Sequence, residues 1–139
     1  MDLTTEYPVP VDTTADVPAS IHGWTRLWNG AYEIADTILS PDARVTFGGL
    51  TVGARADALR GPTEIAALIR DFRSTRPGLV YSEVEVRAGA GFAVVVWNAG
   101  SPDLHRGGID TFSFDGDGRI RSVRSVTGER GWPRASIGA

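Results

Sequence analysis

The spacing of hydrophobic residues changes once along this chain, from a helical period to a strand period. From Pro18 the apolar positions recur three or four residues apart, which predicts an amphipathic helix. Asn29-Gly30 interrupts this pattern, which then resumes from Tyr32 to Leu39. We expect two short helices, or one bent helix, ending at Ser40-Pro41, because the residue before a proline avoids the helical conformation. The apolar positions of the first stretch are Ile21, Trp24, Leu27, Trp28 and Ala31.

A short strand and a further helix are expected next. Apolar and polar residues alternate over positions 43–47, which predicts a strand that ends at Gly48-Gly49. Residues 50–60 show no clear period and are expected to form a loop. Gly61-Pro62-Thr63-Glu64 places a proline in a first turn and an acid near the positive end of a helix dipole. We therefore predict a helix from this point to Arg76-Pro77-Gly78.

From residue 79 the period becomes two, which predicts four strands over 79–88, 92–99, 104–115 and 119–127. Short segments rich in Gly, Asp and Pro separate them, as hairpin turns require. Helices followed by consecutive strands indicate an α+β fold, with the helices packed on one face of a curved, mostly antiparallel sheet. Such an arrangement can enclose a pocket between the sheet and the helices.

The length of the chain bounds its organisation. Its 139 residues are too few for two ordinary domains. We expect one domain over 18–134, a flexible N-terminal arm over 1–17 and a C-terminal tail over 135–139. No apolar run approaches the ~20 residues of a membrane helix, and the first residues lack the features of a signal peptide. A cytoplasmic protein that does not bind membranes is therefore expected.

Composition restricts the chemistry. The chain has no Cys, all 14 of its basic residues are Arg, and its only histidines are His22 and His105. Thiolate, lysine Schiff-base and histidine-rich zinc chemistry are thereby excluded. The net charge of −3 argues against a nucleic-acid partner. Catalysis would have to use carboxylate, imidazole, hydroxyl or guanidinium groups.

Three segments carry a likeness to a known group of proteins. They are WTRLWNGAYEIAD (24–36) with LSPDARV (39–45), GPTEIAALIRDF (61–72) and GIDTFSFDGDGRIRSV (108–123). In their order along the chain and in their residues, they resemble the opening helices and first strand, the third helix and the last hairpin of the nuclear transport factor 2-like superfamily. Within it the chain is most similar to SnoaL-like polyketide cyclases and ketosteroid isomerases. The resemblance implies a cystatin-like, cone-shaped barrel.

The resemblance also assigns positions for functional residues. Asp110 matches the aspartate with which the isomerases donate a hydrogen bond to the substrate oxyanion. The position of their proton-shuttling carboxylate holds Phe47. Their helical tyrosine donor falls near Gly23, beside His22 and Trp24.

Two other reactions of the superfamily lack their residues here. The last-strand carboxylate of limonene-epoxide-hydrolase-like enzymes falls at Ser125, and the strand that carries their Arg-Asp pair reads VVVW (94–97). The acid/base pair of His and Asp in the cyclases has no match in the last strand. Asp110 is the carboxylate that remains to be tested.

Strand alternation places Asp110 on one sheet face with Phe112 and Phe114, and with Arg106 upstream. Aromatic surroundings disfavour the carboxylate anion, so its pKa should rise. A neutral Asp110 could donate to an oxyanion, and an ionised one could act as a base. The structural alternative is an Asp110 that pairs with Arg106 or Arg124 and holds the sheet edge.

Other candidates would assist or enclose this group. His105 lies beside the turn over 100–103, where it could reach the mouth of a pocket or remain a solvated loop residue. His22 could replace the missing helical donor or lie on the surface. The expected substrate-binding residues, several of which could equally be plain core, are Trp24, Trp28, Tyr32, Phe47, Trp97, Asn98, Phe112 and Ser125.

We therefore expect a cofactor-independent cyclase or isomerase that holds no metal. It would act on a hydrophobic, carbonyl-bearing, polyketide-like metabolite in the cone pocket. Asp110 would be the acid/base or oxyanion donor, assisted by His105 or Arg106. The resemblance further implies a homodimer. The alternative is a non-catalytic ligand-binding or dimerising module on the same fold.

Overall fold

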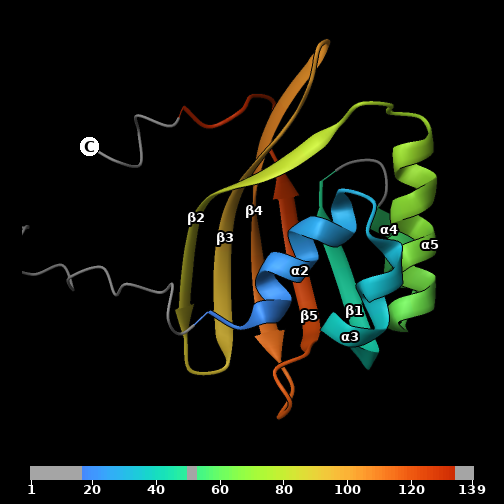
Figure 1. Cartoon of the computed structure of the whole chain (residues 1–139), viewed down its shortest axis with the longest axis vertical. Helices are drawn as coiled ribbons and strands as arrows, with labels where there is room; N and C mark the ends of the chain where they lie inside the picture. Colours follow the sequence, from blue (N-terminus) through green and yellow to red (C-terminus); the bar gives the residue numbers. More distant parts are fainter. Residues whose placement is uncertain (1–16, 50–52, 134–139) are drawn as a thin grey trace, which may run out of the picture.

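Helices cover one face of a curved five-stranded sheet (Figure 1). The computed structural model describes residues 17–49 and 53–133, so the expected arm and tail lie almost entirely outside the described residues. The elements in chain order are α2 (Ala19–Trp28), η1 (Tyr32–Ile34), α3 (Ala35–Ile38), β1 (Leu39–Gly48), α4 (Gly53–Asp57), α5 (Gly61–Ser74), β2 (Val80–Gly89), β3 (Phe92–Ser101), β4 (Leu104–Phe114) and β5 (Ile120–Thr127).

The strand order in the sheet is β1-β5-β4-β3-β2. The last four strands form an antiparallel meander, and β1 pairs with β5 in parallel. The predicted α+β class and the four predicted meander strands are confirmed, with strand ends within two residues of those expected. The sheet does not close into a barrel: β1 and β2 are its two edges, and α2 and α5 cover the concave side (Figure 1).

Two local predictions were wrong. The first strand begins at Leu39, directly after α3, and it contains Pro41. The register between β1 and β5 shifts between Leu39 and Arg44, and such an irregular edge is where a sheet tolerates proline. The second difference is α4, which forms within the expected loop. Its Ala56 is fully buried, so tertiary packing stabilises a helix that is too short to show a period.

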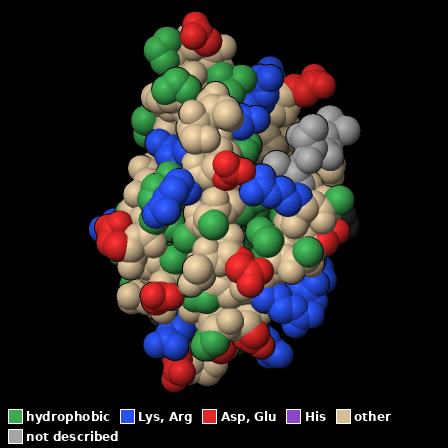
Figure 2. Space-filling view, turned by 90° about the vertical axis from the view of Figure 1, so that its right-hand side faces the viewer, with side chains coloured by type: hydrophobic (Ala, Val, Ile, Leu, Met, Phe, Trp, Pro, Cys, Tyr) green, Lys and Arg blue, Asp and Glu red, His purple; other side chains and the backbone are tan. Residues whose placement is uncertain are grey.

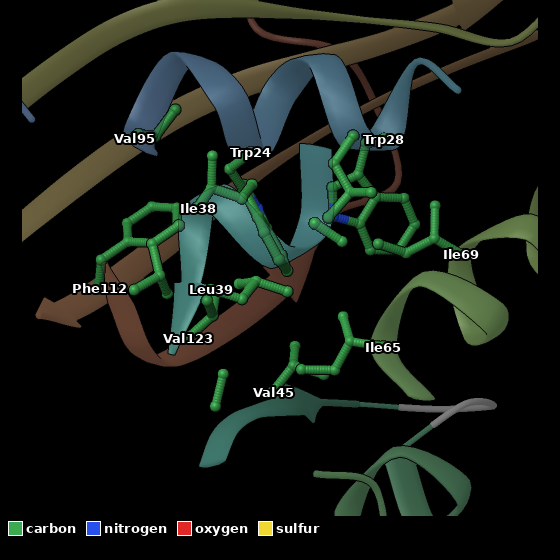
Figure 3. Packing of buried hydrophobic residues seen from close by; sticks show 14 of the residues in the cluster. Trp24, Trp28, Ile38, Leu39, Val45, Ile65, Ile69, Val95, Phe112 and Val123 are labelled. Atoms are coloured by element: carbon green, nitrogen blue, oxygen red, sulfur yellow. The ribbon is translucent and has the colours of Figure 1, made fainter. Parts of the chain in front are cut away.

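The core fills the space between the helices and the concave face of the sheet. Trp24 and Trp28 project from the same side of α2 into this space (Figure 3). Gly23 allows α2 to lie close to α3, since a Cβ atom there would come within 2.5 Å of Ile38 Cγ2. In the described part of the chain, no helix has the length and apolar character needed to cross a membrane.

Candidate active site

A cavity of about 80 Å³ lies between α2, α5 and the concave face of the sheet. Its inner wall is buried, whereas one side consists of half-buried or exposed residues and so faces solvent. We call this side the mouth; it is formed by Thr25, Phe47, Phe72, Tyr81 and Thr127. The buried wall is formed by Trp24, Trp28, Leu68, Val95, Trp97, Asp110 and Ser125.

Asp110 is the one carboxylate that lines this cavity, among the residues that the structure describes. Its side chain is held from two directions. Trp24 Nε1, from α2, donates to Oδ2 at 3.0 Å, and Trp97 Nε1, from β3, donates to Oδ1 at 2.9 Å. Ser125 is paired with Asp110 across β4 and β5, and its side chain also forms a hydrogen bond with the carboxylate.

This environment acts on the pKa of Asp110 in two opposing ways. Burial raises the pKa above its ordinary value, because the anion loses its hydration. The hydrogen bonds from Ser125, Trp24 and Trp97 hold the pKa below the value that burial alone would give. An indole N–H can only donate, so both indoles need an acceptor on the carboxylate. The arrangement therefore suits an ionised Asp110 that accepts a proton more readily than an exposed Asp.

Aromatic rings form most of the remaining wall. The Trp28 ring meets Phe47 and Phe72 edge to face, with centroid separations of 6.1 and 5.6 Å. Tyr81 lies between Trp28 and Trp97, at centroid distances of 5.3 and 5.5 Å. Such a wall binds flat or branched apolar groups and excludes water from Asp110.

Tyr81 brings a further polar group to the cavity, in addition to Asp110 and Ser125. Burial raises the pKa of its phenol far above the ordinary value, and the nearby charge of Asp110 raises it further. The hydroxyl is therefore a hydrogen-bond donor at neutral pH. The Asn29 side-chain amide fixes the strand here: its Nδ2 donates to Tyr81 O at 2.9 Å, and Tyr81 N donates to Asn29 Oδ1 at 2.7 Å.

The structure brings part of the predicted site together. The predicted residues that line the cavity are Trp24, Trp28, Phe47, Trp97, Asp110 and Ser125. His105 and Arg106 do not line it. They lie exposed at the start of β4, and Arg106 Nη1 donates to the backbone carbonyls of His105 and Glu129. We therefore withdraw the expectation that either residue assists Asp110.

Three predicted substrate-binding residues also lie elsewhere. Tyr32 packs beneath Arg70, whose Cζ atom lies 4.7 Å from the centroid of the Tyr32 ring. The two residues line a surface hollow between η1 and α5. Phe112 is buried against Trp24 behind the cavity wall. Asn98 holds the C-terminal segment on the other sheet face: its Nδ2 donates to Trp132 O at 2.9 Å, and its Oδ1 accepts from Trp132 N at 2.6 Å.

Two further expectations can be compared with the structure. His22 is half-exposed and its Nδ1 lies 2.8 Å from Glu83 Oε1, so it joins α2 to β2 without lining the cavity. The alternative in which Asp110 pairs with Arg106 or Arg124 is wrong, because the carboxylate instead bonds the two indoles and Ser125.

Sequence reasoning missed half of the cavity wall. Tyr81 belongs to strand β2, where half-buried residues occupy both faces and the register shifts between Glu83 and Glu85, so alternation gave no clear inward face. Phe72 lies near the C-terminal end of α5, and nothing in the spacing of that helix links it to the pocket. The missed residues are Thr25, Leu68, Phe72, Tyr81, Val95 and Thr127.

Comparison with solved structures identifies the fold. A proposed isomerase of the SnoaL-like family from Agrobacterium tumefaciens is similar over 83% of this chain and 99% of its own, with a TM-score of 0.70 and 19% identity. A proposed ketosteroid isomerase from Kribbella flavida covers 91% of this chain and 90% of its own, with a TM-score of 0.65 and 18% identity. A proposed SnoaL-like polyketide cyclase from Jannaschia covers 87% and 91%, with a TM-score of 0.67 and 14% identity.

The chain therefore has the fold of SnoaL-like proteins, as the resemblance of its sequence implied. Identities this low show the fold and leave the activity to be argued from the site. No protein-family model and no curated protein matches the sequence. Within residues 17–49 and 53–133, no group of three or more His, Asp or Glu side chains is placed to hold a metal ion.

Proposed function

We propose that this chain is a cofactor-independent enzyme that moves a proton at the carbon next to the carbonyl of a small apolar substrate. The similar solved structures, which are named as proposed isomerases and a proposed cyclase, support a reaction of this class. The observation that carries the proposal is Asp110, a buried carboxylate on a cavity wall, with both oxygens oriented by indole N–H groups. A base needs this combination of fixed orientation and raised pKa to work near neutral pH.

In the proposed reaction the ionised Asp110 removes a proton from the α-carbon and becomes neutral. The electron pair left on carbon moves to the carbonyl oxygen and forms an enolate. The Tyr81 hydroxyl, which is protonated at neutral pH, donates a hydrogen bond to this oxygen. Asp110 then returns the proton to the same carbon or to another carbon of the conjugated system, and its carboxylate is restored.

The size of the cavity limits the substrate. Pockets that enclose drug-sized ligands measure ~300–1,000 Å³, whereas this cavity measures about 80 Å³. A polycyclic polyketide does not fit inside it in the described conformation. We therefore propose a smaller carbonyl compound, or a longer one that inserts only its carbonyl end and leaves the remainder at the mouth.

A second candidate is a ligand-binding module without catalysis, and one observation favours it. The Asp110 carboxylate satisfies two indole N–H groups and joins α2 to the sheet, which is a structural task that needs no chemistry. Proton transfer distinguishes the two candidates, because a binding module would hold the ketone without exchanging its α-protons.

The first experiment follows deuterium incorporation into butanone in D₂O by NMR, since butanone is a small, uncharged ketone. The protein should accelerate exchange at the α-carbons by at least about 100-fold over buffer of the same pD. The rate should rise with pD as Asp110 becomes ionised. Exchange no faster than with heat-denatured protein, together with clear binding of butanone, would instead support the binding module.

A further inference from the structure

Two arginines lie beside the mouth of the cavity, at the C-terminal end of α5. The Arg76 guanidinium covers the ring of Phe72, with Cζ 3.8 Å from the ring centroid. Arg73 Nη1 donates to the carbonyl oxygens of Trp28 and Leu79, both at 2.8 Å. Since Phe72 and Trp28 line the cavity, and Leu79 lies two residues before Tyr81, both guanidinium groups are held against its wall.

No carboxylate of the described residues neutralises these two charges. The ion pairs formed within this part of the chain join His22 to Glu83, Arg55 to Asp71 and Arg87 to Glu85. The face that carries α5 shows several arginine side chains among scattered acids (Figure 2). The charges of Arg73 and Arg76 reach the Tyr81 phenol and lower its pKa, whereas Asp110 raises it. The positive charges of Arg73 and Arg76 therefore lie beside the mouth, near Tyr81, and the negative charge of Asp110 lies at the buried end of the cavity.

We propose that the mouth selects substrates with a carboxylate, or another anionic group, at the end opposite the reacting carbonyl, and that Arg76 determines this specificity. The inference rests on the proposed function, because it assumes that the carbonyl end lies beside Asp110. A ligand in the reverse orientation would place its anion against the Asp110 carboxylate, which like-charge repulsion disfavours. The two ends of the cavity therefore fix the direction in which the ligand enters.

The hydrogen bonds of both arginines leave donors for such an anion. Arg76 Nη1 donates to Phe72 O and to Thr75 Oγ1, both at 3.0 Å, and Arg73 uses Nη1 for its two carbonyls. Each guanidinium has five N–H donors in a planar fork that matches a carboxylate. Because these contacts hold both side chains in place, little further rotamer freedom is lost when an anion binds.

The test compares two ligands that differ only in charge, 4-oxopentanoate and its neutral amide 4-oxopentanamide. Binding is followed through the indole N–H signals of the four tryptophans. Trp24, Trp28 and Trp97 report on the cavity, and Trp132 on the opposite sheet face is the internal control. We expect the carboxylate to bind about tenfold more tightly than the amide at low ionic strength, and this preference to fall as salt screens the charges.

Two matched variants test whether Arg76 causes this preference for the carboxylate. Arg76→Gln should reduce the ratio of the two affinities below about threefold, whereas Arg70→Gln should leave the ratio unchanged. Arg70 also lies over an aromatic ring, that of Tyr32, but away from the cavity. Equal affinity for the two ligands, or an equal effect of both variants, would overturn the inference and leave the proposed function standing. If neither ligand shifted the three cavity indoles, the inference would be contradicted, and the butanone exchange assay would decide the proposed function separately.

Discussion

Replacing Asp110 with Asn should reduce catalysed deuterium exchange of butanone by at least about 100-fold, close to the buffer rate. Asn keeps the shape of the side chain but cannot accept a proton from carbon at neutral pH. The exchange assay measures this loss directly, as kcat/KM at a fixed pD. Asp103→Asn is the matched control, because Asp103 is exposed in the turn between β3 and β4, and this variant should retain the parent rate.

The amide group introduced by Asp110→Asn would bring an N–H group opposite one of the two indole N–H donors, so the variant could lose stability as well as activity. A second pair of proteins separates these effects. Trp97→Phe removes one indole donor, and Trp97→Phe with Asp110→Asn can then be compared with Trp97→Phe alone in the folded state. Equal exchange rates in these two proteins, with both folded, would show that Asp110 is not the base.

Gly108→Ala should lower the free energy of unfolding by about 3 kcal/mol. Gly108 is buried on β4 opposite Trp97, and a Cβ atom there would overlap the Trp97 ring and come within 2.5 Å of Val126 O. The backbone on one side cannot move without disturbing the pairing of β4 with β5. The ring on the other side cannot move without releasing its hydrogen bond to Asp110. Chemical denaturation measures the loss.

Gly116→Ala is the control for this prediction. Gly116 lies in the turn between β4 and β5, where an added Cβ atom would meet no other atom within 4 Å. The change in its free energy of unfolding should stay within about 0.5 kcal/mol. A Gly108→Ala protein as stable as Gly116→Ala would mean that the contact between β4 and Trp97 is looser than described.

The sequence predicted half of the cavity lining, partly on α2 and partly in the sheet. Alternation along β4 placed Asp110 inward, and the hairpin register places Val95 and Ser125 opposite it. The same alternation argues against Asn98, since Trp97 points into the cavity and the next residue must point out. The contact between Trp24 and Asp110 spans 86 positions, so only the packing of α2 against the sheet creates it.

The errors at His105 and Arg106 have a related physical cause. Sequence alternation gives the face of a strand but not how far along the strand the helices reach. Arg106 shares the sheet face of Asp110, yet it lies where β4 is exposed and bonds the C-terminal segment at Glu129. The mouth depends in the same way on where α5 ends and where β2 begins. Residue periodicity locates these two boundaries only approximately.

The most direct test of a proton-accepting Asp110 is an NMR titration of the indole N–H signals against pH. Trp24 and Trp97 donate to opposite oxygens of one carboxylate, so both signals should shift together as it ionises. Burial predicts a common midpoint above the ordinary aspartate pKa of 3.8, and Asp110→Asn should abolish both shifts. A midpoint at or below 3.8, or shifts that persist in Asp110→Asn, would contradict the assignment of Asp110 as the base.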